Sequence, residues 1–221
     1  MTESPEKPTG VLLAGGQSRR MADAFADGQG DKGLLDIAGR PMIAHVIARL
    51  SPQVGHMVIN ANGDPARLAE FGLPVVPDPI DGYPGPLAGI LAGMRWSAAH
   101  APGATHVLSV ATDAPFIPAD LAGRLAAALR LSTGRIALAR SASGLHPVIG
   151  LWPVALADDL ETALRAGTRK VLAWTDNHGT VAVDFPLTDI AGCAVDPFFN
   201  ANTPAELAEA RRLLTSSGNL C

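Results

Sequence analysis

The sequence predicts an α/β fold of three layers, α/β/α, in which helices cover both faces of a mostly parallel central sheet. Short apolar runs of strand length alternate with amphipathic helical patterns through the first two thirds of the 221 residues. This order produces parallel strands joined by crossover helices. Polar residues or glycines follow directly after several of the runs, as they do at the carboxyl ends of strands in open α/β sheets. Because no repeat, linker or low-complexity block divides the sequence, we expect a single domain over residues 1–221.

The expected strands are short runs of mainly aliphatic residues. The run at 11–13 is apolar throughout, as in a strand buried on both faces, and the run at 105–111 is the strongest after it. The runs at 136–139 and 148–152 lie close together in the sequence, so we expect them to pair antiparallel. In order, the expected strands lie at 11–13, 58–59, 75–76, 105–111, 136–139, 148–152 and 181–183.

The expected helices are marked by apolar side chains that recur every three or four residues. Pro41 suits the first turn of a helix over 41–50, and Asp64 caps a short helix over 65–71. A stiff, glycine-punctuated loop over 81–89 opens the next helix. Further helices are expected at 118–130, 156–164, 170–174 and after 204. In chain order, the apolar residues expected to face the core are Ile43, Val46, Ile47 and Leu50; Leu87, Ile90, Leu91 and Met94; Leu121, Leu125 and Leu129; Leu156, Leu160 and Leu164; and Leu207, Ala210 and Leu214.

The composition excludes several classes of protein. Hydrophobic residues make up 48% and charged residues 17% of the chain, which suits a compact protein rather than a disordered one. The formal net charge of −4 gives no general attraction to nucleic acid or to an anionic membrane, so any anion site must be local. Two cysteines form no disulfide framework, and neither a signal peptide nor a bilayer-spanning run is present. We therefore expect a cytoplasmic protein that uses neither nucleic acid nor membrane as a partner.

A glycine pair, Gly15 and Gly16, follows the first strand and precedes two arginines. Glycines there let the backbone approach a ligand closely, and free backbone N–H groups in such a turn bind anions. Arg20 and Lys32 add positive charge, so this stretch is predicted to hold a nucleoside triphosphate. On the glycines alone, an ordinary strand-to-helix turn with two solvated arginines is the favoured interpretation. The spacing matches neither a dinucleotide-binding fingerprint nor a P-loop.

Polar side chains follow the other expected strands at the same edge of the sheet: Asn60, Asn62, Asp78 and Asp113. Asp113 ends the strongest of these runs, where a carboxylate oxygen suits Mg²⁺, an ion usually bound by one or two carboxylates and substrate phosphates. The alternative for Asp113 is a cap ahead of a turn, and the asparagines and Asp78 are also common turn formers.

The remaining histidine and serine patterns carry weaker signals. No histidine pairs with cysteine, aspartate or glutamate at zinc-binding spacing, and Ser18 lacks the context of a nucleophilic serine. His146 stands out because Pro147 fixes its backbone just before an expected strand. On the residues alone, a structural histidine is still the favoured interpretation of His146.

Taken together, the motifs resemble those of a known family. Leu13-Ala14-Gly15-Gly16-x-Ser18-x-Arg20-Met21 followed by Asp31-Lys32-Gly33-Leu34-Leu35 is similar to the signature of nucleotidyltransferases with a glycosyltransferase-A-like, Rossmann-like fold. Within that group the chain resembles the molybdenum cofactor guanylyltransferases. The further matching stretches are Asn60-Ala61-Asn62, Asp78, the 83–89 segment Tyr-Pro-Gly-Pro-Leu-Ala-Gly, Asp113-Ala114-Pro115, His146-Pro147 and Asn200-Ala201-Asn202-Thr203-Pro204.

The resemblance implies roles for single residues. It implies guanine nucleotide binding by Leu13, Ala14, Gly15, Gly16, Lys32, Asn60, Asp78 and Asp113, with Asp113 as the Mg²⁺ ligand. It also implies that Arg20, Lys32 and Asp113 act directly in catalysis. His146, Asn200 and Asn202 fall where the family places its pterin. The N-terminal part would then bind GTP and the C-terminal part molybdopterin. One departure is the longer 22–30 stretch between the methionine and the lysine motif.

The reaction that the resemblance implies is transfer of GMP from GTP to molybdenum-molybdopterin, with Mg²⁺ as cofactor and pyrophosphate as the second product. A molybdenum insertase and molybdoenzyme chaperones are the implied protein partners. Three alternatives stay open: a cytidylyltransferase for the same pterin, a sugar-phosphate nucleotidyltransferase, and a guanine-nucleotide sensor without turnover. Cytidylyl members tend to carry Ala-Ala-Gly where this chain has Leu13-Ala14-Gly15-Gly16, which favours guanine.

Overall fold

The computed structural model describes residues 6–14, 31–82 and 85–217, and a seven-stranded sheet forms its centre. The strand order is β5-β4-β1-β6-β8-β7-β9. Only β8 runs against the others, pairing antiparallel with β6 and β7, so the mostly parallel sheet and its one predicted antiparallel pair are confirmed. The strands are β1 (Thr9–Leu13), β4 (His56–Asn60), β5 (Val75–Val76), β6 (His106–Ala111), β7 (Ile136–Ser141), β8 (Gly144–Pro153) and β9 (Thr180–Asp184).

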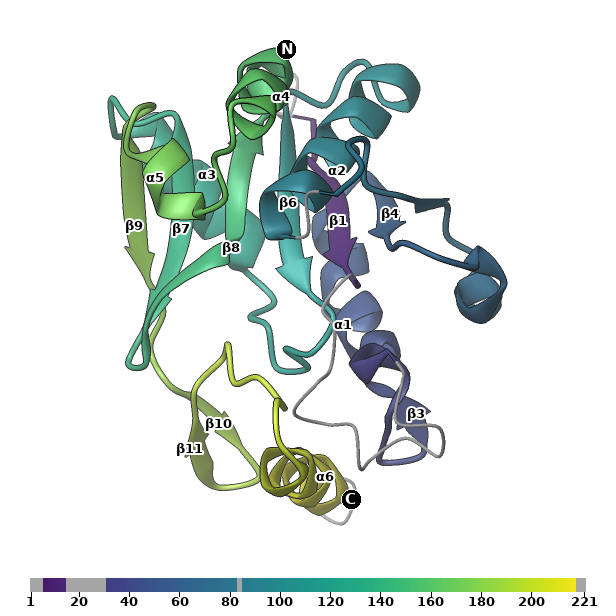
Figure 1. Ribbon diagram of the computed structural model, residues 1–221. Helices are drawn as coiled ribbons and strands as arrows, with labels where there is room; N and C mark the ends of the chain where they lie inside the picture. The colour runs from purple at the N-terminus through teal and green to yellow at the C-terminus, as the bar shows by residue number, and fades with distance from the viewer. Residues whose placement is uncertain (1–5, 15–30, 83–84, 218–221) are drawn as a thin grey trace.

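Helices cover both faces of this sheet, as predicted (Figure 1). Along β1, Leu12 packs in a cluster with α1 (Met42–Leu50) and α3 (Leu121–Arg130). The neighbouring Val11 packs on the other face with α2 (Pro86–His100), α4 (Ala157–Arg165) and α5 (Val171–Thr175). Because successive side chains of a strand point to opposite faces, the apolar run of β1 fills both layers of the core.

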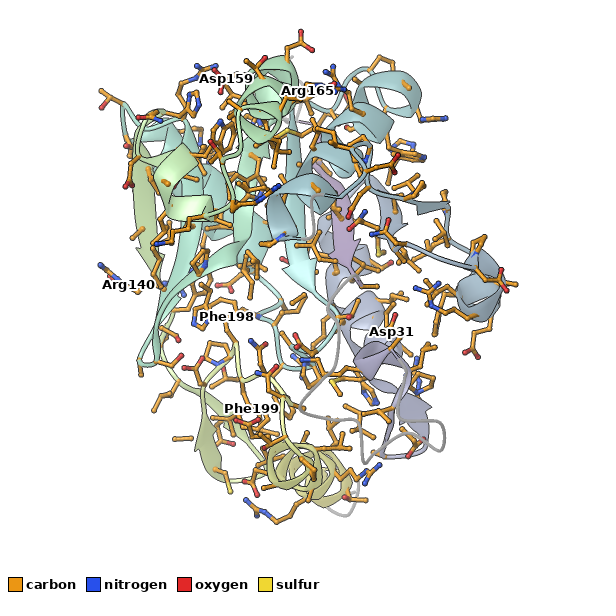
Figure 2. All side chains as sticks on the ribbon, in the orientation of Figure 1. Asp31, Arg140, Asp159, Arg165, Phe198 and Phe199 are labelled. Carbon is orange, nitrogen blue, oxygen red and sulfur yellow. The ribbon has the colours of Figure 1, made fainter. Side chains whose placement is uncertain are left out.

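A third, smaller core lies beyond the carboxyl edge of the sheet, in the lower part of Figure 1. It is built by β2 (Asp36–Ile37), β3 (Arg40–Pro41), β10 (Thr188–Ile190), β11 (Cys193–Val195) and α6 (Pro204–Ser217). Phe198 packs into the sheet's core and Phe199 against the smaller core, and Figure 2 shows the two rings between the sheet and α6. The segment that carries them therefore joins the two cores at the sheet edge where ligands of α/β proteins bind.

The structure differs from the sequence predictions in a few elements. Helix α2 begins at Pro86, so the second half of the expected 81–89 loop is helical. Strand β8 begins at Gly144, so His146 and Pro147 lie inside the strand rather than before it. Helix α3 begins at Leu121 rather than at 118. The described residues also form short 3₁₀ helices: η2 (Lys32–Leu34), η3 (Ser51–Gln53), η4 (Pro65–Phe71) and η5 (Val154–Leu156). None of the described helices combines the length and apolar character needed to span a bilayer.

Candidate active site

Three distant parts of the chain meet at the carboxyl edge of the sheet. Lys32 lies at the start of η2, and its Nζ donates a hydrogen bond to Oδ2 of Asp113, which lies just beyond the end of β6. The same Nζ donates to Asn202 Oδ1 at 2.5 Å, from the segment that precedes α6. All three belong to the residues singled out from the sequence, and the structure brings them into direct contact.

The backbone around Asp113 explains why these groups converge. Strand β6 lies beside β1 in parallel register, and the Thr112 N–H donates to the Leu13 carbonyl at 3.4 Å. The Ala201 N–H donates to the Asp113 carbonyl at 3.2 Å, which ties the C-terminal segment to the end of β6. Gly33 packs so closely on Thr112 that a Cβ atom there would lie 3.0 Å from the threonine Cβ. Backbone contacts thus hold η2, β6 and the C-terminal segment together.

The site contains unsatisfied acceptors. Among the described residues, three buried side-chain oxygens lack a hydrogen-bond partner: Asp31 Oδ2, Asp113 Oδ1 and Asn200 Oδ1. Buried polar atoms normally have partners, so oxygens without one at a ligand-binding edge indicate that a donor or a cation completes them. Hard oxygen donors of this kind suit a divalent cation such as Mg²⁺. The described residues hold no cluster of three or more histidine, cysteine or acidic groups that could bind a metal alone. A divalent cation at this site would therefore be bound by one carboxylate together with phosphate oxygens of a substrate.

Asp31 lies beside this site and was not singled out from the sequence as a functional residue. Its Oδ1 accepts from the Gly33 N–H at 2.9 Å and so caps η2, while its Oδ2 lies 3.8 Å from Arg67 Nη2. Burial raises the pKa of Asp31, although the Gly33 amide and the charges of Arg67 and Lys32 act in the opposite direction. The charge of Asp113 adds to the increase. Burial of the charged carboxylate therefore opposes folding.

This yields a stability prediction for Asp31→Asn. The amide keeps the cap oxygen but carries no charge, so the free energy of unfolding should rise at pH 7. The pKa of Asp31 is higher in the folded than in the unfolded protein. Its contribution to the stability of the wild type is therefore fully present below the pKa of the unfolded state and is lost as the pH rises through the pKa of the folded state. The difference between variant and wild type should therefore grow from acidic to neutral pH in urea unfolding. Asp189→Asn, at an exposed turn cap, is the control and should show no such growth; a variant less stable than wild type at pH 7 contradicts the account.

A second polar group lies at the ends of β4 and β5. Asn60 Nδ2 donates to Asp78 Oδ1 at 2.9 Å and Asn62 Nδ2 donates to Asp78 Oδ2 at 2.8 Å. The Asp78 N–H returns a hydrogen bond to Asn62 Oδ1 at 2.9 Å. Next to them, the Ala14 N–H donates to the Asn60 carbonyl at 2.9 Å. The structure therefore places Leu13, Ala14, Asn60 and Asp78 side by side, as the predicted nucleotide site requires.

Gly89 of α2 determines how closely this group packs. A Cβ atom there would overlap Asn60 Oδ1 and lie 2.7 Å from Leu13 Cδ2. We expect Gly89→Ala to push both side chains aside and to weaken binding at the predicted nucleotide site about tenfold or more, measured by calorimetric titration with GTP, with a loss of stability of about 1–3 kcal/mol.

Gly123→Ala is the matched control for Gly89→Ala. Gly123 also lies within a helix, α3, but a Cβ atom there would meet nothing within 4 Å. Alanine should therefore stabilise the protein by up to about 1 kcal/mol through helix propensity and leave GTP binding unchanged. Equal GTP affinity in both variants would show that the fit around Gly89 does not shape the nucleotide site.

His146 belongs to a cluster that includes two residues the sequence did not reveal. Its Nε2 lies 2.7 Å from Ser141 Oγ, and Ser141 in turn donates to Asp196 Oδ2 at 2.7 Å. Ser141 and Asp196 are 55 residues apart, so no local sequence pattern could have paired them. The strand predicted over 136–139 stops two residues short of Ser141, so the sequence prediction did not mark its place at the end of β7.

The remaining predicted residues cannot be placed. Gly15, Gly16 and Arg20 lie outside the described residues, as do Ser18 and the 22–30 stretch. Their proposed roles stay predictions.

Comparison with known proteins identifies the family of this chain. The family model described as a MobA-like NTP transferase domain matches residues 10–183. A molybdenum cofactor guanylyltransferase of Bradyrhizobium sp. (strain ORS 278) is 52% identical over 205 residues, 92% of each chain. One of Rhodopseudomonas palustris (strain BisB5) is 50% identical over 214 residues, 96% of each chain.

The fold has a counterpart among solved structures. The crystal structure of molybdopterin-guanine dinucleotide biosynthesis protein A from Archaeoglobus fulgidus superposes with a TM-score of 0.68 at 22% identity, covering 94% of this chain and 98% of the other. This match supports the fold, and the closer sequence relatives support the family. The chain therefore belongs to the MobA-like NTP transferase family, among the enzymes named molybdenum cofactor guanylyltransferase.

Proposed function

We propose that this protein transfers GMP from GTP to molybdenum-molybdopterin, giving the guanine dinucleotide form of the cofactor and pyrophosphate. The observation that carries the proposal is the contact of Lys32 with both Asp113 and Asn202 at the carboxyl edge of the sheet. It joins the predicted phosphate-binding, cation-binding and pterin-binding parts in one place. The named activity of relatives at 50% and 52% identity supports the same reaction.

The reaction needs positioning and charge stabilisation more than covalent help. An ionised phosphate oxygen of the acceptor attacks the α-phosphorus of GTP and forms a new P–O bond. The bond between the α-phosphorus and the bridging oxygen breaks, and its electron pair leaves with pyrophosphate. Holding two such reactants in line removes much of the barrier, and cationic groups stabilise the charge that builds up on the leaving oxygens.

Different residues at the sheet edge would bind the cation and the phosphates. Asp113 would hold Mg²⁺ through Oδ1, the oxygen without a partner, and the bound ion would withdraw charge from the phosphates. Lys32 would exchange its contact with Asp113 for the phosphates of GTP, together with Arg20 and the backbone at Gly15 and Gly16. Its pairing with Asp113 holds the Lys32 ammonium group at the carboxyl edge of the sheet, where the phosphates of GTP would bind.

The nucleoside and the acceptor would lie on opposite sides of this centre. Leu13, Ala14, Asn60 and Asp78 form the nucleotide side, and Asn60 and Asp78 present amide and carboxylate groups able to bind base or ribose hydroxyls. His146, Asn200 and Asn202 form the pterin side. A single domain over 1–221 would then bind GTP with its N-terminal part and molybdopterin with its C-terminal part. A molybdenum insertase that supplies the acceptor and chaperones that receive the product complete the proposal.

Two assays test the proposal. The first compares thermal stabilisation by GTP, CTP, ATP and UTP, each with Mg²⁺, and GTP should raise the melting temperature most. The second measures pyrophosphate release from GTP with the molybdenum-loaded acceptor and with the acceptor omitted. Stabilisation mainly by CTP would assign a cytidylyltransferase, whereas GTP binding without pyrophosphate release would assign a nucleotide sensor. Pyrophosphate release with a sugar phosphate in place of the pterin would assign the third alternative.

A further inference from the structure

A hydrogen-bonded cluster outside the transfer centre joins the β7–β8 hairpin to the C-terminal segment. Ser141 ends β7, His146 lies in β8, and Asp196 follows β11. Asp196 Oδ2 accepts from Ser141 Oγ at 2.7 Å and from the Ser143 N–H at 3.3 Å, and its Oδ1 accepts from the Phe198 N–H at 2.9 Å. Five or six residues further on, this segment reaches the end of β6 and Lys32.

The order of the three side chains excludes a nucleophilic serine. In a serine protease triad the histidine lies between serine and aspartate, so that it can take the serine proton while the carboxylate orients it. Here the serine lies in the middle, between His146 Nε2 and Asp196 Oδ2, each 2.7 Å away. The serine proton points to the carboxylate, and the histidine contacts no carboxylate in this cluster.

The same order fixes the protons. Burial alone would raise the pKa of Asp196, but hydrogen bonds from Ser141, Phe198 and Ser143 outweigh burial and lower it, so the carboxylate is ionised near neutral pH. An ionised carboxylate only accepts, so Ser141 must donate to it. Because the hydroxyl proton of Ser141 is already donated to Asp196, the serine oxygen can only accept a hydrogen bond from His146. His146 must therefore carry its proton on Nε2.

The other ring nitrogen of His146 is then an acceptor. Burial lowers the pKa of His146, although the charge of Asp196 acts in the opposite direction, so the ring is neutral near pH 7. A neutral ring protonated on Nε2 has a lone pair on Nδ1, and no described residue donates to that nitrogen. The Phe198 ring packs against the imidazole with the ring centroids 4.7 Å apart, which limits how the ring can turn.

We propose that Ser141 and Asp196 are positioning residues that fix His146 with its proton on Nε2, so that Nδ1 accepts an N–H of the pterin ring of the acceptor. Pterin rings carry several N–H donors on one edge, and an acceptor on a half-buried side chain such as His146 favours such a group, because an unmatched partner loses a hydrogen bond. The substrate in this inference rests on the proposed function, whereas the proton arrangement rests on the contacts and on the charge states of Asp196 and His146 given above.

Asp196→Asn tests the arrangement because it reverses the chain of hydrogen bonds. The asparagine Oδ1 keeps the stronger bond from the Phe198 N–H, which turns its Nδ2 toward Ser141. Ser141 must then accept from the amide and donate to His146 Nε2, and the imidazole proton moves to Nδ1. The variant thus removes the acceptor nitrogen while the side chain keeps its shape.

The direct readout is the protonation of each imidazole nitrogen by ¹⁵N NMR of histidine-labelled protein. The chain has six histidines, and the His146 signals are those missing in His146→Gln. The wild type should show a protonated Nε2 and a bare Nδ1, and Asp196→Asn should show the reverse. Bare Nδ1 in both proteins, or protonated Nδ1 in the wild type, overturns the inference.

Kinetics test the role of the arrangement. We expect Asp196→Asn and Ser141→Ala to raise the KM for the pterin acceptor about tenfold, the cost of about one hydrogen bond, and to leave the KM for GTP within about twofold. Ser141→Thr keeps the hydroxyl and should restore the acceptor KM.

The matched control is Ser132→Ala, which removes a serine that accepts from the Gly134 N–H in an exposed turn and should leave both constants unchanged. An equal rise in both KM values, or no change in the acceptor KM after the proton has moved, contradicts the acceptor-binding role. Absence of any transfer by the wild type would instead overturn the proposed function, while the NMR result still decides the proton arrangement.

Discussion

Asp113→Ala is expected to lower the rate of GMP transfer by about three decades or more while the protein stays folded. Asp113 Oδ1 is buried without a hydrogen-bond partner and would hold Mg²⁺ in the proposed mechanism, while Oδ2 pairs with Lys32. Loss of a metal ligand at a transferring phosphate removes several kcal/mol of charge stabilisation, and each decade of rate corresponds to about 1.4 kcal/mol. Steady-state pyrophosphate release at saturating GTP and varied Mg²⁺ measures the effect.

Two further variants make this test specific. Asp113→Asn keeps the shape and an oxygen but not the charge, so it should also lose most activity. Asp120→Ala removes an exposed carboxylate whose closest cation, Arg124, lies 3.9 Å away, and it should behave as wild type. A cooperative thermal transition in each variant shows that the chain is folded. Activity close to wild type in Asp113→Ala at limiting Mg²⁺ would show that another group binds the ion.

Lys32→Ala is expected to lower kcat/KM by about two to three decades. In the proposed mechanism the lysine brings a positive charge to the phosphates of GTP, and one preorganised donor to developing charge is worth about that factor. Lys32→Arg should restore little, because a planar guanidinium cannot replace an ammonium held between one carboxylate and one amide oxygen. Lys170→Ala, on an exposed lysine ahead of α5, is the matched control.

The ion pair of Lys32 and Asp113 also predicts that the losses of stability in the two single variants are not additive. Each single variant leaves the partner's charge behind at a site where both side chains are nearly buried, 14% and 13% exposed. Removing both charges together should therefore cost less stability than the sum of the two single losses, with a coupling of about 1–3 kcal/mol. Urea unfolding of the wild type, the two single variants and the double variant measures this coupling. Strict additivity would contradict the ion pair.

Much of the fold could be predicted because its core strands and helices have strong local patterns. The apolar run of β1 predicts a strand buried on both faces, and Val11 and Leu12 do pack on opposite sides of the sheet. By contrast, β10 and β11 have only three residues each. Their pairing depends on the smaller core under α6 rather than on any local pattern.

The candidate site was predictable where topology alone gathers residues. The ends of β4, β5 and β6 lie at one edge, so Asn60, Asn62, Asp78 and Asp113 could be grouped from the sequence. Asp31 and Asp196 were missed as functional candidates because their importance comes from burial and from partners far along the chain. Such contacts form only when the folded chain brings distant segments together.

The central claim is that Lys32 and Asp113, which contact each other in the structure, separate to hold the triphosphate and its divalent ion. A crystal structure with a non-hydrolysable GTP analogue and Mg²⁺ tests it most directly. The account predicts the ion on Asp113 Oδ1 and Lys32 Nζ against the phosphates, with the nucleoside beside Asn60 and Asp78. An intact contact between Lys32 and Asp113, with the ion bound elsewhere, would contradict it.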